Sequence, residues 1–508
     1  MIAKLFSAAH LGIEAFPVEV EVDLTPGAFF YITVGLPDAA VKESQNRILA
    51  ALKNSGFEMP IKKITVNLAP ADVRKEGSAF DLPIALAILA AQGIIPAERL
   101  NDLFIIGELA LDGRVKPVRG MLSVAVTVKA RHAAGLLCPA DNAGEAAVVE
   151  GVNVYPVETL AQAVGWLLGE TAIEKAKPML FGLGATVEDE VDFTDVKGQY
   201  HVRRAVEVAA AGGHNVLMIG PPGSGKSMIA RRLPTVMPGW SLEEAIDCSR
   251  IHSVAGLLGR NISVLSRRPF RAPHHTVSDA GLVGGGNNPV LPGEVSLAHH
   301  GVLFLAELPE FRRSALEVLR QPLEDGRVVI ARASSSVAFP AEFMMVCAMN
   351  PCPCGFSTDP VKECRCTTLE IRRYRQKISG PLLDRIDIQV DVPAVKYQEL
   401  KGDADGESSA AIRARVDMAQ SRQKKRFAKS RIYRNAQMGS KQIKTHCRVG
   451  PESENLLKMA MERLGLSARA HSRILKVART IADLAGCDDI RTEHMAEAIQ
   501  YRALERGL

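Results

Sequence analysis

One stretch between an apolar run and a helix-like segment has the composition of a phosphate-binding loop. It matches the pattern G-x-x-x-x-G-K-S with Gly220, Pro221, Pro222, Gly223, Ser224, Gly225, Lys226 and Ser227. Glycines let backbone N–H groups wrap phosphates, the lysine reaches the β- and γ-phosphates, and the serine hydroxyl contacts Mg²⁺. The stretch therefore predicts a nucleoside triphosphate site.

Phosphoryl transfer also needs a metal-holding Asp and a residue that orients water. The run GVLFLAELPEF supplies Glu307 at its end, but Ala306 stands where the metal-holding Asp is expected. We therefore expect a chain that binds nucleotide and hydrolyses it poorly. A merely buried strand is the alternative interpretation, which the acidic residues that end the run disfavour.

Further polar side chains stand where they can assist this reaction. Asn350 ends the run FMMVCAMNP and can orient water, and Arg385 in SGPLLDRIDI is a planar cation suited to reach across a subunit boundary. Arg469, with Arg473 one turn later, opens a helix-like segment. On spacing alone, ordinary ion pairs or turn roles are favoured for each of them.

Four of the nine cysteines form a cluster with metal-ligand spacing. Cys352 and Cys354 are one residue apart, as are Cys364 and Cys366, and nine residues separate the pairs. Four thiolates in so short a segment suit tetrahedral Zn²⁺, so the cluster predicts a zinc site. Free thiols are the alternative, because this spacing is tighter than the usual C-x₂-C.

Two basic segments are candidates for DNA contact. SRQKKRFAKSRIYRN has no acidic residue and includes Lys424, Lys425 and Arg426. Such a segment can follow a phosphate backbone, and a solvated helix face is the alternative. EDGRVVIARASSSVAFP predicts a β-hairpin with Arg332 near its tip.

These residues require an α/β scaffold to position them. We expect an α/β domain at 1–170, a linker at 171–195, a core with a parallel sheet at 196–395, and a helical lid at 396–508. Strands are expected at 29–36, 62–70, 103–111, 215–219, 301–305 and 343–349, and helices at 39–55, 82–92, 456–466, 473–486 and 492–504.

Charge is distributed unevenly along the 508 residues. Residues 1–170 carry 14 Lys and Arg against 19 Asp and Glu, a net charge of −5, and the remaining residues carry 48 against 38, a net charge of +10. A polyanion is expected to meet the second part. No apolar run is long enough to span a bilayer and no secretory signal is evident, so the expected location is the cytoplasm, with reduced cysteines.

Several long motifs together resemble one family of motors. GPPGSGKS, RPFRAPHHTVSDAGLVGGG, PGEVSLAHHGVLFLAELPEFRRSALEVLRQPLEDG, AMNPCPCG and SARAHSRILKVARTIADLAG are similar to the magnesium-chelatase-like AAA+ ATPases, and among them to the ComM-type competence helicases. The resemblance covers the whole chain. It implies a homo-hexameric ring that uses ATP and Mg²⁺ to drive branch migration of DNA junctions in homologous recombination and natural transformation. The expected partners are single-stranded and branched DNA, with recombination proteins as further partners.

The same resemblance implies roles for individual residues. Lys226 and Ser227 become phosphate and metal contacts, Glu307 the catalytic acidic residue, Asn350 sensor 1, Arg385 a finger acting on the neighbouring subunit, and Arg469 sensor 2, with Arg473 a second candidate. Such hairpins as the one with Arg332 line the pore of related motors. The family motif reads L-D-E-L-P-E-F, so Ala306 is a departure.

The first 170 residues resemble the Lon-type protease domain. KEGSAFDLPIAL places Ser78 at the nucleophile position, but Leu122 stands where the matching lysine is expected. A serine without a base is not activated, so we expect a non-proteolytic scaffold, with Lys116 or Lys129 as the remaining candidate bases. Two rival functions stay open: a chelatase-like ATPase that remodels a protein for metal insertion, and a Lon-like ATP-dependent peptidase.

Overall fold

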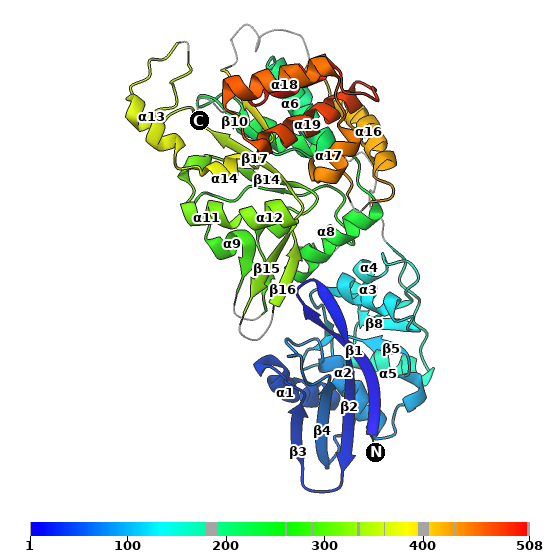
Figure 1. The fold of residues 1–508 in the computed structure, drawn as a ribbon. Helices are drawn as coiled ribbons and strands as arrows, with labels where there is room; N and C mark the ends of the chain where they lie inside the picture. Colours follow the sequence, from blue (N-terminus) through cyan, green and yellow to red (C-terminus); the bar gives the residue numbers. More distant parts are fainter. Residues whose placement is uncertain are drawn as a thin grey trace.

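The computed structural model of the chain describes residues 2–178, 191–259, 262–286, 289–332, 336–359, 361–394, 406–430 and 432–504. Figure 1 shows an N-terminal α/β domain at one end, a central α/β core and a helical cap over the far side of that core. Most of the expected linker, 179–190, and the start of the expected lid, 396–405, lie outside the described residues. Every described helix is too short or too polar to cross a bilayer.

A seven-stranded sheet organises the N-terminal domain, in the order β3-β4-β2-β1-β5-β8-β9. Its strands are β1 (Ile2–Leu11), β2 (Glu14–Thr25), β3 (Phe30–Val34), β4 (Lys63–Ala69), β5 (Leu103–Ile105), β8 (Gly135–Pro139) and β9 (Val154–Val157). A small pair, β6 (Glu108–Leu109) and β7 (Val115–Lys116), lies beside it. The long antiparallel hairpin β1–β2 was not among the strands expected from the sequence.

Five helices complete this domain: α1 (Ala39–Asn54), α2 (Asp81–Ala91), α3 (Met121–Ala130), α4 (Ala140–Ala146) and α5 (Leu160–Leu168). The first begins where the Asp38 side chain accepts a hydrogen bond from the backbone N–H of Val41 at 2.7 Å, an N-cap of the usual kind. Every residue of α2 is buried, and this helix packs on β1 and β2. It is therefore the centre of the domain core.

A five-stranded parallel sheet forms the core, in the order β11-β14-β17-β10-β18. The strands are β10 (Val216–Ile219), β11 (Phe270–Arg271), β14 (Val302–Leu305), β17 (Met344–Met349) and β18 (Ile388–Asp391). The sequence had indicated three of them. Because all run the same way, the loops that follow their carboxyl ends gather at one edge of the sheet, where ligands bind in such folds.

Helices and a hairpin surround this sheet. The helices are α6 (Tyr200–Gly212), α7 (Lys226–Val236), α8 (Leu242–Val254), α9 (Asp279–Val283), α10 (Glu294–Leu297), α11 (Arg313–Val318), α12 (Arg320–Asp325), α13 (Thr368–Arg375) and α14 (Gly380–Leu383). A short pair, β12 (Gly284–Gly285) and β13 (Leu291–Pro292), follows α9. The expected hairpin is present as β15 (Arg327–Ala331) and β16 (Ser336–Pro340), which are antiparallel. In Figure 1 it points from the core toward the N-terminal domain.

The helical cap contains α16 (Ser409–Arg426), α17 (Ser440–His446), α18 (Pro451–Leu464), α19 (Ala468–Leu484) and α20 (Thr492–Gln500). All three helices expected in this region are present. The apolar face of α19 is buried in a core that continues under the sheet, with Ile474, Val477 and Ile481 next to Val216 and Ile388 in one cluster. The cap is thus packed firmly on the core rather than tethered to it.

The N-terminal domain is held on the core by a buried arginine. Arg250 of α8 is 8% exposed, and its Nη2 donates to the backbone oxygen of Ile13 and to Glu14, both at 3.1 Å. Nearby, the turn of the β1–β2 hairpin meets β16 so closely that a Cβ on Gly12 would lie 2.6 Å from Val337. The hairpin β15–β16 is therefore in direct contact with the N-terminal domain of its own chain.

Candidate nucleotide site

The phosphate-binding loop joins the carboxyl end of β10 to the start of α7. Gly223 and Gly225 have φ angles of +79° and +90°, a region that glycine enters without strain. Gly220 lies so close to β18 that a Cβ would be 2.1 Å from the backbone oxygen of Val392. The loop thus wraps tightly at the N-terminus of a buried helix, which is a ready-made anion site.

Lys226 is folded back over this loop. Its Nζ donates to the backbone oxygens of Gly220 at 2.6 Å and Pro221 at 2.8 Å, and to Asn350 Oδ1 at 3.3 Å. Burial lowers the pKa of Lys226 to about 8, against the opposing negative charge of Glu307. The structure therefore brings Lys226 and Asn350 together across the ends of β10 and β17.

Glu307 follows β14 at the same edge of the sheet. Its backbone φ angle is +56°, a value that residues other than glycine rarely adopt. Its side chain is 63% exposed. His275 Nδ1 lies 3.7 Å from Glu307 Oε2, whereas the neighbouring His274 is hydrogen-bonded to Thr276 Oγ1 at 2.9 Å. The contact of His275 with Glu307 was missed, because nothing in the sequence brings the end of β11 to the end of β14.

Arg385 lies at the opposite end of the parallel strands, just before the amino end of β18. It is 6% exposed, its Nη2 pairs with the Glu324 carboxylate of α12, and its Nη1 donates to the backbone oxygen of Pro381 at 2.5 Å. Burial is the main cause that lowers the pKa of Arg385, and the positive charges of Arg469 and Arg473 add to it. These arginines therefore form one positively charged group.

Both lid arginines reach this group from the start of α19. Arg469 Nη1 is 3.6 Å from Asp384 Oδ2 and the side chain is 68% exposed, whereas Arg473 is paired with the buried Asp387. Burial alone would raise the pKa of Asp387, but the charge of Arg473 and the hydrogen bond of His214 hold it well below its usual range. Arg469 is thus the freer side chain.

The two groups lie at opposite ends of the same strands. β10 and β18 run parallel and pair from Val216 with Ile388 to Ile219 with Asp391. Lys226 follows the carboxyl ends, whereas Arg385 precedes the amino ends, and the four residues of β10 alone measure about 13 Å. Lys226 and Arg385 of one chain therefore lie too far apart to contact the same phosphate group.

The four clustered cysteines lie within reach of one ion. Their sulfur atoms all lie within 4.8 Å of one another, and Cys352 Sγ is 3.3 Å from Cys354 Sγ and 3.8 Å from Cys364 Sγ. Tetrahedral ligands at the Zn–S distance of about 2.3 Å are about 3.8 Å apart, so the donor set fits. Backbone N–H groups of Phe356 and Arg365 lower the pKa of Cys354 to about 6, whereas burial and the neighbouring thiols raise the pKa values of Cys364 and Cys366.

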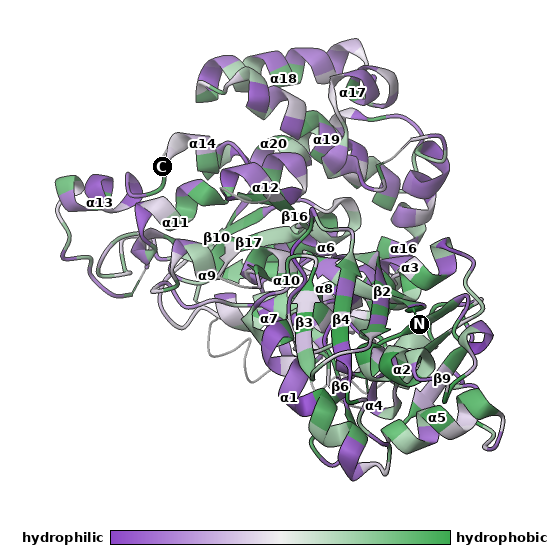
Figure 2. Cartoon of the chain, turned by 90° about the horizontal axis from the view of Figure 1, so that it is seen from below, coloured by the Kyte–Doolittle hydropathy of each residue, from purple (hydrophilic) through white to green (hydrophobic). Residues whose placement is uncertain are grey.

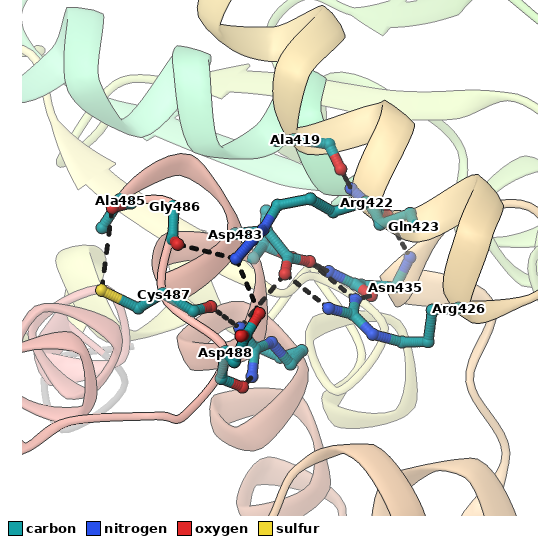
Figure 3. Close-up of polar contacts among 12 residues, drawn as sticks. Ala419, Arg422, Gln423, Arg426, Asn435, Asp483, Ala485, Gly486, Cys487 and Asp488 are labelled. Atoms are coloured by element: carbon teal, nitrogen blue, oxygen red, sulfur yellow. Dashed lines mark hydrogen bonds and ion pairs between the residues drawn. The ribbon is translucent and has the colours of Figure 1, made fainter.

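The basic segment expected to contact DNA is divided by the fold. Lys424 and Lys425 are exposed on the last turn of α16. Arg426 instead donates to the buried carboxylate of Asp483 at 2.5 and 2.7 Å and to Asn435 Oδ1 at 2.9 Å, as Figure 3 shows. Its expected DNA role is therefore corrected: an arginine that neutralises a buried carboxylate holds α16 on α19.

Arg332 lies at the start of the hairpin tip, whose residues 333–335 are outside the described residues. Its positive charge acts on Glu76 of the N-terminal domain. Burial raises the pKa of Glu76, and the positive charges of Arg74 and Arg332 oppose this rise. The side chain expected to face DNA thus also faces an acidic group of its own chain.

The Lon-like position shows no lysine beside the serine among the contacts of the described residues. Ser78 Oγ donates to the carboxylate of Glu108, and Leu122 is fully buried in α3. Lys116 and Lys129 are both exposed. This geometry gives Ser78 a hydrogen-bonded role.

Comparison with known proteins places the whole chain in one family. The model of the magnesium chelatase subunit ChlI matches residues 192–400, a second ChlI model matches 20–142, and the ChlI C-terminal model matches 406–502. The chain is 43% identical over 512 residues to competence protein ComM of Haemophilus influenzae, covering 100% of this chain and 98% of ComM.

Two further relatives agree with this placement. Protein YifB of Escherichia coli is 42% identical over 502 residues, covering 98% of this chain and 97% of YifB. The magnesium-chelatase 38 kDa subunit of Rhodobacter capsulatus is 25% identical over 198 residues, covering 36% of this chain and 55% of that subunit. The family indicates an ATPase. The chain belongs to the ComM/YifB group of the magnesium-chelatase-like AAA+ ATPases.

Proposed function

We propose that this chain is an ATP-driven DNA motor that assembles as a ring of six and moves single-stranded and branched DNA by branch migration, in the recombination that follows DNA uptake. The relation to a competence protein supports the biological setting. The main observation that supports the motor activity is the pair of half-sites at opposite ends of the parallel strands of one sheet. A closed ring brings each half-site to the complementary one of a neighbour.

Within this ring the residues have separate tasks. Lys226 and the loop N–H groups bind the phosphates of ATP, Ser227 holds Mg²⁺, and Asn350 and Glu307 orient and polarise water in the same chain. Arg385 and Arg469 stabilise the transferred phosphoryl group from the neighbouring chain. Mg²⁺, when bound, neutralises phosphate charge. Ala306 gives it no carboxylate, so hydrolysis is weak.

Two surfaces are proposed to contact DNA: the exposed Lys424 and Lys425, and the hairpin with Arg332. Arg426 is left out, because Asp483 neutralises it. The net charge of +10 beyond residue 170 supports this side of the molecule as the DNA side. The cysteine cluster is proposed to hold Zn²⁺, on the fit of its sulfur positions.

The salt dependence of DNA affinity tests this function. We expect the full chain with ATP to bind branched DNA with an affinity that falls linearly with salt on a logarithmic plot. Replacing Lys424 and Lys425 together by Ala removes two phosphate contacts and lowers the slope by about 1.4 to 1.8. The matched control replaces Lys42 and Lys62 of the N-terminal domain, both exposed, and leaves the slope unchanged.

Absence of any salt-sensitive DNA affinity in the presence of ATP would show that the DNA motor is wrong and would favour the protein-remodelling function. Peptidase activity is disfavoured by the hydrogen bond of Ser78 to Glu108 and the buried Leu122.

A further inference from the structure

The segment with the four cysteines touches the phosphate-binding loop. We call residues 352–359 and 361–366 the cysteine knuckle. A Cβ built on Gly355 would lie 2.6 Å from Cδ and 2.8 Å from Cγ of Pro222, so the knuckle backbone rests directly on the Pro222 ring. The φ angle of Gly355 is +87°, and the glycine therefore permits both the turn and the close approach.

The knuckle is also joined to the phosphate-binding loop through the adjacent strand. Only Pro351 separates Asn350 from Cys352, and Asn350 Oδ1 accepts the hydrogen bond from Lys226. At the end of the same strand, the backbone oxygen of Met349 accepts a hydrogen bond from the N–H of Gly220 at 3.2 Å. Movement of the knuckle is thus transmitted to both ends of the phosphate-binding loop.

Helix α13 holds the knuckle from its other side. Arg375 donates from Nε and Nη2 to the backbone oxygen of Pro351 at 3.2 and 3.1 Å. Burial raises the pKa of Tyr374 to about 12, and a hydrogen bond with the Asn350 backbone opposes the rise. Figures 1 and 2 show this helix at the periphery of the molecule, and Figure 2 shows it as mostly hydrophilic. Apart from Cys352 and Gly355, the knuckle residues are half-buried or exposed, so the four sulfur atoms are its main internal crosslink.

We propose that the zinc-loaded cysteine knuckle is a positioning element for the nucleotide. With four thiolates around one ion, the knuckle holds Pro222 and Asn350 where the loop accepts phosphates. Zinc and nucleotide then favour each other's binding, and linkage requires both effects to be equal in size. This inference rests on the proposed zinc and nucleotide sites and adds the coupling between them.

Zinc affinity of the full chain, measured by competition with a coloured chelator with and without saturating ADP, tests the coupling. We expect ADP to raise the zinc affinity about tenfold, within the usual range of couplings between sites. Removal of zinc should weaken binding of a fluorescent ADP analogue by the same factor. A purely structural zinc site would affect the folding of the chain but would not show this reciprocal factor.

Three variants sharpen the test. Pro222→Ala removes the ring atoms that touch Gly355, so zinc and ADP should each still bind while the coupling factor falls toward one. Lys226→Ala should abolish the effect of ADP on zinc. Cys487→Ser, in a partly exposed cysteine of the cap, is the control that leaves the factor unchanged.

The possible outcomes separate the proposed coupling from the proposed motor function. ADP that binds without any change in zinc affinity overturns the coupling, and so does a chain that takes up no zinc, while the motor proposal stands in both cases. A chain that binds zinc but no nucleotide overturns the proposed function instead.

Discussion

At the scale of single residues, Ala306 is the feature with the largest expected chemical effect. It follows β14 directly, next to Glu307, and its methyl group packs against the apolar core. A carboxylate at this point belongs to the Mg²⁺ site of P-loop NTPases, where the ion neutralises the charge that develops on the phosphoryl group. Under the proposed function, Ala306 leaves Mg²⁺ without this protein ligand.

Ala306→Asp should therefore raise the turnover of ATP. We expect a gain of about 100-fold, which corresponds to about 2.7 kcal/mol of transition-state stabilisation. Steady-state ATP hydrolysis with saturating Mg²⁺ measures it. Ala306→Asn, of similar size but uncharged, is the control and should gain little. Equal rates for all three chains would mean that another group already holds the metal.

Lys226 predicts a pH dependence of nucleotide binding. Because burial lowers its pKa to about 8, the amine is charged below that pH and neutral above it in the free chain. Phosphates favour the charged amine, so affinity should fall as pH rises past about 8, approaching about tenfold per pH unit. Titrations with a fluorescent nucleotide between about pH 7 and pH 9.5 measure this.

Lys226→Arg supplies the comparison, because an arginine stays charged throughout this range. Its affinity for nucleotide should be nearly flat with pH. A wild-type chain with the same flat profile would contradict the lowered pKa.

At the scale of elements, the sequence predicted the strands and the cysteine cluster whose residue pattern lies within one short segment. The apolar runs before Lys226, Glu307 and Asn350 became β10, β14 and β17, and the spacing of the cysteines indicated their cluster. The N-terminal hairpin β1–β2 was missed because its first strand contains a run of small residues without clear alternation. Contacts between distant elements carry no local signal, which is why His275 beside Glu307 and the ion pair of Arg426 required the structure.

Helix α12 connects two functional elements. Its Glu324 pairs with Arg385, and the helix leads within two residues into β15 of the hairpin. In the proposed ring, Arg385 has to leave Glu324 before it can reach a neighbour's nucleotide. The pair thus links the position of the hairpin to the availability of the arginine.

Glu324→Gln should release Arg385 and raise turnover without DNA. Glu324 is 58% exposed but Arg385 is only 7% exposed, and we expect a gain of about fivefold, which corresponds to about 1 kcal/mol. ATP hydrolysis in the Ala306→Asp background measures it. Glu493→Gln, which breaks the exposed pair with Arg491, is the control. A fall in turnover would show that Glu324 supports the arginine rather than restrains it.

At the scale of the whole molecule, three folded parts form one continuous body. Arg250 holds the N-terminal domain on α8, and the cap shares its apolar core with the parallel sheet. The acidic first part also lies against the hairpin β15–β16 near its tip, where Arg332 faces Glu76. In the proposed ring, the two half-sites of each chain are completed by other copies.

Mixing two inactive variants tests the sharing of sites between copies. In the Ala306→Asp background, Lys226→Ala loses the phosphate half and Arg385→Ala loses the arginine half. Random assembly of equal amounts gives intact pairs at about one interface in four, so about a quarter of the parental turnover should return. Arg469→Ala, whose side chain is exposed, repeats the test without disturbing the core.

Lys226→Ala mixed with Glu307→Gln is the decisive control, because both changes damage the same half-site. In such mixtures every subunit lacks either Lys226 or Glu307, so no interface combines an intact phosphate half-site with an arginine from its neighbour. Turnover should therefore stay at the level of the single variants. If the Lys226→Ala and Arg385→Ala mixture also stays there, while light scattering shows mixed assemblies, the arginines act within their own chain. The structure argues against that outcome, because the parallel strands of one chain hold Lys226 and Arg385 at opposite ends.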